Sequence, residues 1–116
     1  MLSFALNHMT VARQSFGQVL QTARTLGMVG IELRNDLPQA MFDGLAPEAA
    51  GEAIRASGLR LLALAEVKRF NDWSSDKAAE ALAMMKTAKA AGAEAVSLIP
   101  RNDNLGMGNG ERQANL

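Results

Sequence analysis

Residues 23–33 of the chain read Ala23-Arg24-Thr25-Leu26-Gly27-Met28-Val29-Gly30-Ile31-Glu32-Leu33. A helical pattern ends at the first glycine, and an apolar strand pattern starts two residues later. The same order recurs ahead of residues 59–65 and 95–99. The glycines at the three junctions are Gly27, Gly58 and Gly92. Their separations of 31 and 34 residues match one strand-plus-helix unit, so the pattern predicts a parallel α/β protein.

Four strands and three helices complete this pattern. Apolar runs predict strands over residues 3–7, 29–33, 59–65 and 95–99. Ser15 starts the first helix with Gln18 as its capping-box partner, and Pro47 opens the second helix, where its missing N–H costs nothing. The third helix follows Ser74-Ser75, and residues 111–116 read as the first turns of a fourth. The apolar residues at helical spacing in the third helix are Ala78, Ala81, Leu82, Met85 and Ala88.

Length and composition narrow the class of protein. The 116 residues fit one small domain, which we expect to be a single partial domain over residues 1–116 that stops within the fourth helix. Twelve basic and twelve acidic residues cancel, which disfavours nucleic acid and anionic membranes as partners. The sequence has no cysteine, and no apolar run approaches the ~20 residues of a membrane span. A cytoplasmic protein is the expectation.

The order βαβαβαβ is shared by two architectures. One is a small doubly wound sheet of the flavodoxin-like type, and the other is the first half of a (β/α)₈ barrel, which typically needs ~250 residues. In both, ligands bind at the carboxyl ends of the strands. The residues that follow the four predicted strands are Asn7, His8, Glu32, Arg34, Asn35, Asp36, Glu66, Lys68, Arg69, Asn71, Asp72, Trp73, Arg101, Asn102, Asp103 and Asn104. Loops are polar in general, but four such strand ends together indicate a small polyhydroxylated substrate.

His8 and Glu32 are the two most informative of these residues. His8 is the single histidine of the chain, and at a strand's carboxyl end it suits proton transfer, metal binding or a hydrogen bond to a substrate hydroxyl as well as a structural role. Glu32 lies within an apolar strand, and the period of two places it on the same face as Arg34. A buried carboxylate needs a partner, so we expect a Glu32–Arg34 ion pair that is structural or orients a substrate.

Two other patterns carry weaker signals. The spacing of His8, Glu32, Asp36 and Glu66 matches no compact metal-binding motif, although hard cations and zinc accept such ligands. The glycine-rich run at residues 106–110 is compatible with a phosphate cradle, but it lacks the lysine of a P-loop and follows the fourth strand. A solvated loop explains it more simply. The first strand-to-helix turn contains no glycine, which argues against a dinucleotide site.

The strand ends carry a resemblance to a known family. The matching pieces are Leu6-Asn7-His8, Gly30-Ile31-Glu32-Leu33-Arg34-Asn35-Asp36, Arg69-Phe70-Asn71-Asp72-Trp73 and Pro100-Arg101-Asn102-Asp103. With these pieces the chain resembles the xylose isomerase-like TIM-barrel family, the sugar phosphate isomerases and epimerases related to endonuclease IV.

The resemblance implies a barrel enzyme that moves a proton next to a carbonyl with the help of a divalent metal. In the family the metal ligands come from later strands, so no metal ligand is carried over to this chain. A substrate-facing role is carried over to five residues: His8, Glu32, Arg34, Lys68 and Asn71. The neutral charge disfavours an activity on DNA.

We therefore interpret the chain as the N-terminal half of a (β/α)₈ barrel from a sugar or sugar-phosphate isomerase or epimerase. On its own we expect it to be catalytically inactive. Its unpaired edge strands favour self-association or a partner that completes the barrel. The alternative is a flavodoxin-like α/β module, not an enzyme, that binds a phosphorylated ligand.

Overall fold

The computed structural model describes residues 2–72 and 74–100. Strands and helices alternate along this part of the chain. In order, the elements are β1 (Ala5–Asn7), the 3₁₀ turn η1 (His8–Val11), α1 (Phe16–Thr25), β2 (Gly30–Arg34), α2 (Pro47–Ala56), β3 (Arg60–Lys68), α3 (Ser75–Ala91) and β4 (Val96–Ile99).

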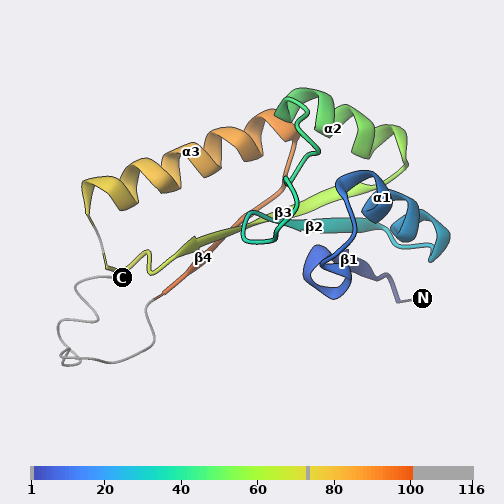
Figure 1. Cartoon of the computed structure of the whole chain (residues 1–116), viewed down its shortest axis with the longest axis horizontal. Coiled ribbons are helices and arrows are strands. Elements are labelled where there is room, and N and C mark those ends of the chain that lie inside the picture. The colour runs from blue at the N-terminus through green and yellow to red at the C-terminus, as the bar shows by residue number, and fades with distance from the viewer. Residues whose placement is uncertain (1, 73, 101–116) are drawn as a thin grey trace.

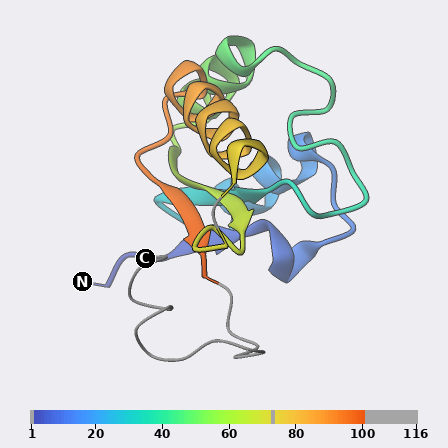
Figure 2. The same ribbon diagram turned by 90° about the vertical axis from the view of Figure 1, so that its left-hand side faces the viewer.

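The four strands form one parallel sheet in the order β1-β2-β3-β4. Right-handed crossovers between consecutive neighbouring strands place every helix on the same face. Figures 1 and 2 show α2 and α3 side by side over this face, and buried residues of all three helices join the strands in one hydrophobic core. A flavodoxin-like sheet has the strand order 2-1-3-4 with helices on both faces, so that alternative is wrong. The architecture is that of half a (β/α)₈ barrel.

The helix boundaries follow the predicted signals. The Ser15 side chain accepts a hydrogen bond from the Gln18 backbone and the Gln18 side chain accepts one from the Ser15 N–H, which completes the capping box. Pro47 stands in the first turn of α2, and the Ser74 side chain caps α3. The three junction glycines all have φ between 69° and 77°, a left-handed conformation that glycine adopts without strain.

Strand β3 is longer than predicted. It continues three residues beyond the apolar run, to Lys68, because Val67 and Lys68 pair with Leu98 and Ile99 of β4. The pairing register shifts between Ala65 and Val67, so Glu66 is an extra residue in β3. Such a bulge redirects the side chains around it. Residues that sequence reasoning placed in a loop therefore belong to the sheet.

The apolar residues of α3 divide between two sides of the helix. Ala81, Met84 and Ala88 are buried, whereas Leu82 and Met85 are 53% and 48% exposed. The buried residues contact the core over the sheet. Leu82 and Met85 remain largely exposed, and Met85 lines a groove between α3 and β4.

Several predicted features fall outside the described residues. These are Trp73, residues 101–104, the glycine-rich run 106–110 and the fourth helix at residues 111–116. Within residues 2–72 and 74–100, no helix is both long and apolar enough to span a membrane.

Candidate functional site

The carboxyl ends of β2 and β3 bring four charged side chains together. In β2, Ile31 and Leu33 are fully buried in the core beneath the helices. By strand alternation, Glu32 and Arg34 lie on the opposite face of the sheet. Arg34 is the last residue of β2, and Glu66 and Lys68 lie near the end of β3, the next strand in the sheet.

Arg34 is the centre of this group. Its Nε donates to Asp36 Oδ1 at 2.9 Å and its Nη2 donates to Asp36 Oδ2 at 2.8 Å, so the guanidinium grips the carboxylate with two parallel hydrogen bonds. The same Nη2 lies 3.2 Å from Glu66 Oε1. Lys68 Nζ lies 3.7 Å from Asp36 Oδ2 and 3.5 Å from Glu66 Oε1. Each carboxylate is thus shared between two cations, and we call these residues the four-charge cluster.

Burial separates one member of the four-charge cluster from the others. The side chains of Arg34, Asp36 and Glu66 are 17%, 22% and 11% exposed. The Lys68 side chain is 61% exposed. Because screening by water is weaker for partly buried groups, the first three charges hold each other in place, and Lys68 is the member most open to a ligand.

The ion pairs of the four-charge cluster shift the pKa values of Asp36 and Arg34. The hydrogen bonds from Arg34 lower the pKa of Asp36, against a smaller opposing effect of desolvation. The same bonds raise the pKa of Arg34, and the negative charges of Asp36, Glu66 and Glu32 add to this effect. Arg34 and Asp36 therefore stay ionised at neutral pH.

Asn35 fixes the two strand ends to each other. Its Nδ2 donates to the Glu66 carbonyl at 3.2 Å, and its Oδ1 accepts from the Glu66 N–H at 3.0 Å. Its own N–H donates to the Ala65 carbonyl at 2.8 Å. An amide that satisfies both backbone groups of the extra residue in β3 replaces the ladder bonds that the bulge removes. Asn35 thereby positions Glu66 against Arg34.

The predicted Glu32–Arg34 ion pair is wrong. The ion pairs of Arg34 run to Asp36 and Glu66, and Glu32, which is half-buried, acts on Arg34 through its charge at longer range. Asp36 reaches the guanidinium from just beyond β2, and the bulge brings Glu66 to it from β3. Nothing in the local sequence of β2 indicates the partner on β3.

His8 lies in η1, directly after β1, and is fully buried. Its Nε2 is 2.8 Å from the Gln14 carbonyl oxygen, and because a carbonyl only accepts, Nε2 carries the proton. Nδ1 is also buried and has no hydrogen-bond partner among the described residues. His8 therefore ties η1 to the start of α1. Asn71, in the turn after β3, is 3% exposed.

Of the five predicted site residues, the structure joins Arg34 and Lys68 through two shared carboxylates. The carboxylates belong to Asp36 and Glu66, which the resemblance did not select. The Arg34–Asp36 pair could have been predicted from the sequence, because the two opposite charges are only two residues apart.

The metal implied by the resemblance does not fit these residues. Within residues 2–72 and 74–100, no group of three or more histidine, cysteine, aspartate or glutamate side chains is placed to hold a metal ion. Asp36 and Glu66 are each already paired with two cations, so a divalent ion would have to displace Arg34 and Lys68. Among the described residues, the four-charge cluster therefore lacks the ligand set of a metal site.

Comparison with solved structures supports the fold. Over 97% of this chain, the structure of a xylose isomerase domain containing protein from Salmonella typhimurium LT2 superposes with a TM-score of 0.87 at 22% sequence identity. The fold is that of half a xylose isomerase-like barrel. The protein SMc04130 from Sinorhizobium meliloti 1021 superposes with a TM-score of 0.71 at 18% identity over 97% of this chain.

In both cases the chain spans 42% of the neighbour's length. This share agrees with the N-terminal half of a barrel. In such a barrel, the four-charge cluster lies at the carboxyl end of the strands, where these folds bind ligands. No protein-family model matches the chain, and no curated protein matches it either.

Proposed function

We propose that the chain is the substrate-binding portion of a sugar or sugar-phosphate isomerase or epimerase-like barrel, and that the four-charge cluster binds a small polyhydroxylated substrate. The observation that carries the proposal is the position of the cluster. Four charges joined by shared ion pairs, three of them mostly buried, lie at the carboxyl ends of β2 and β3. In barrels of this kind that end carries the ligand site.

The chemistry of the cluster suits vicinal hydroxyls. Asp36 and Glu66 keep acceptor lone pairs beyond those used by Arg34, since an ionised carboxylate has about four such sites. Lys68 supplies an exposed ammonium donor. A hydroxyl can donate to a carboxylate and accept from the ammonium at the same time. Charged groups already fixed by one another lose little freedom when such a ligand binds.

The reaction proposed for the whole barrel is proton transfer next to a carbonyl, assisted by a divalent metal. The four-charge cluster does not fit that metal, so its ligands have to come from outside the described residues. For this chain alone we propose substrate binding without turnover. Metal-dependent isomerisation of a ketose by the purified 116-residue chain would contradict that part of the proposal.

Binding is tested by saturation-transfer NMR with a panel of free ketoses and aldoses and their phosphate esters. The variant Arg34→Gln removes the guanidinium fork, and Arg60→Gln serves as the control. Arg60 forms a similar two-bond pair with Glu94 at the opposite end of the sheet. We expect Arg34→Gln to lose binding and Arg60→Gln to keep it. Equal loss in both variants, or binding that neither affects, would contradict a site at the cluster.

A further inference from the structure

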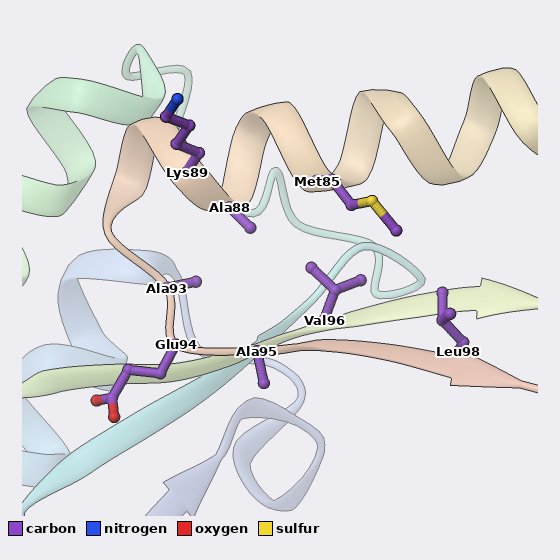
Figure 3. A pocket seen from close by; sticks show the side chains of 8 residues that line it. All are labelled: Met85, Ala88, Lys89, Ala93, Glu94, Ala95, Val96 and Leu98. Carbon is purple, nitrogen blue, oxygen red and sulfur yellow. The ribbon is translucent and has the colours of Figure 1, made fainter.

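Large apolar side chains are exposed at the two outer strands, β1 and β4, which each pair with a single strand among the described residues. At the β4 edge, a groove of about 460 Å³ lies between α3 and β4, with Met85, Ala88, Val96 and Leu98 among its lining residues. Figure 3 shows Val96 and Leu98 pointing from β4 toward α3. At the β1 edge, Leu2 and Phe4 are 81% and 61% exposed just before the strand.

We propose that these two edges bind each other between copies of the chain, so that β4 of one copy pairs with β1 of the next. All four strands run parallel, so β1 of a second copy can extend the sheet beyond β4 in the same direction. A two-fold axis along the barrel axis then joins the remaining β4 and β1 edges in the same way. The result is a closed ring of eight parallel strands without a free edge.

The side chains at the two edges fit this arrangement. The Phe4 carbonyl accepts a hydrogen bond from the Val29 N–H, so Phe4 already lies in register with the neighbouring strand. Alternation places its side chain on the face of Leu6, which is buried in the core beneath the helices. In the β4–β1 pair, Phe4 of the second copy therefore lies on the helix side, where the groove opens between Met85 and Leu98.

Charge and surface chemistry agree with a second copy as the occupant. The net charge of zero means that two copies do not repel each other. Burying an exposed aromatic ring and several aliphatic side chains favours association. This inference does not depend on the identity of any ligand.

The test is sedimentation velocity of the intact chain at tens of micromolar. We expect a discrete species of twice 12.3 kDa. Phe4→Glu and Leu98→Lys each place a charge in the proposed contact and should each give a monomer. Leu26→Glu is the matched control, because Leu26 has the same 61% exposure as Phe4 but lies at the end of α1. It should leave the dimer intact.

Mixing the two monomeric variants sharpens the test. In a mixed ring, one contact has both native residues, and the other places the introduced carboxylate of Phe4→Glu next to the introduced ammonium of Leu98→Lys. We therefore expect the equimolar mixture to recover the dimer. Far-UV circular dichroism establishes that both variants keep the fold. A monomeric native chain, a dimer that survives Phe4→Glu, or a mixture that stays monomeric would each overturn the proposal.

Discussion

The two ends of the sheet each hold an arginine that grips a carboxylate with two hydrogen bonds. At the carboxyl end Arg34 binds Asp36, with side-chain exposures of 17% and 22%. At the amino end Arg60 binds Glu94, with exposures of 62% and 46%. The first pair is shared with Glu66 and Lys68, whereas the second has no further ion-pair partner among the described residues. A two-bond ion pair therefore does not by itself distinguish the two ends, and our proposal of a ligand site at the carboxyl end depends on partial burial and shared partners.

The amino end differs in a second respect, because its backbone is closely packed. An added Cβ on Gly30 would lie 2.6 Å from the Arg60 carbonyl oxygen and 2.9 Å from Leu62 Cγ. In barrels of this kind the amino end contributes stability and the carboxyl end contributes chemistry. The contrast between the two ends leads to the following predictions.

Gly30→Ala should have the largest effect on stability. The methyl group meets a backbone carbonyl that cannot move aside without disturbing the β2–β3 pairing, so we expect a loss of about 3 kcal/mol in the apparent free energy of unfolding. Gly17→Ala in α1 is the control, since its nearest neighbour is 4.0 Å away. That change should stabilise by about 0.5–1 kcal/mol through helix propensity. If urea titrations showed Gly17→Ala to be less stable than Gly30→Ala, this would contradict the close approach of Gly30 to the Arg60 carbonyl oxygen.

Arg34→Gln should have the next largest effect, and it should act on binding as well. Without the guanidinium, two mostly buried carboxylates retain Lys68 as their shared ion-pair partner, which we expect to cost about 1–2 kcal/mol. Arg34→Lys keeps the positive charge but loses the planar fork. It should recover part of the stability and little of the ligand affinity, as measured by urea titration and ligand-observed NMR. Full recovery of affinity in Arg34→Lys would show that charge alone is sufficient.

Much of the fold could be predicted from the sequence because its signals are local. The junction glycines, the Ser15 capping box and Pro47 each act within a few residues. These signals define the order of strands and helices but not the spatial order of the strands. The resemblance favoured the barrel, and the order β1-β2-β3-β4 decided against the doubly wound sheet.

The site was harder to predict because its contacts are not local. Arg34 and Lys68 were predicted, but the partners of Arg34 depend on the β2–β3 pairing and on the bulge at Glu66. An apolar run also predicts the end of a strand poorly where charged residues continue it, as Glu66 and Lys68 do in β3. For His8, the sequence predicted the position but not the hydrogen bond that its side chain makes. Its position suggested chemistry, but its Nε2 binds the backbone of Gln14.

Acid should weaken the carboxyl end selectively. The pKa of Asp36 is lowered by Arg34 from an ordinary value of 3.8. A lowered pKa stabilises the folded state at pH values above 3.8, and this contribution is lost as the pH falls through the folded-state pKa. The stability difference between the native chain and Asp36→Asn should therefore be constant from about pH 7 to about pH 5 and shrink below about pH 4. Glu94→Gln is the control. Its stability difference from the native chain should be smaller at every pH and should be reduced by salt. If the stability difference between the native chain and Asp36→Asn grew as the pH fell, this would contradict a lowered pKa for Asp36.

Arg60→Gln should have the smallest effect of these substitutions. The Arg60–Glu94 pair raises the pKa of Arg60 and lowers that of Glu94, yet both side chains are largely in solvent. The entropy lost in holding two long exposed side chains in one geometry offsets most of the attraction. We expect the ligand affinity to stay at the native value and the urea midpoint to fall much less than in Arg34→Gln, with a small difference that salt reduces as it does for Glu94→Gln. A loss of stability as large as that of Arg34→Gln would mean that geometry, and not burial or shared partners, sets the strength of these pairs, and the distinction between the two ends of the sheet would fail.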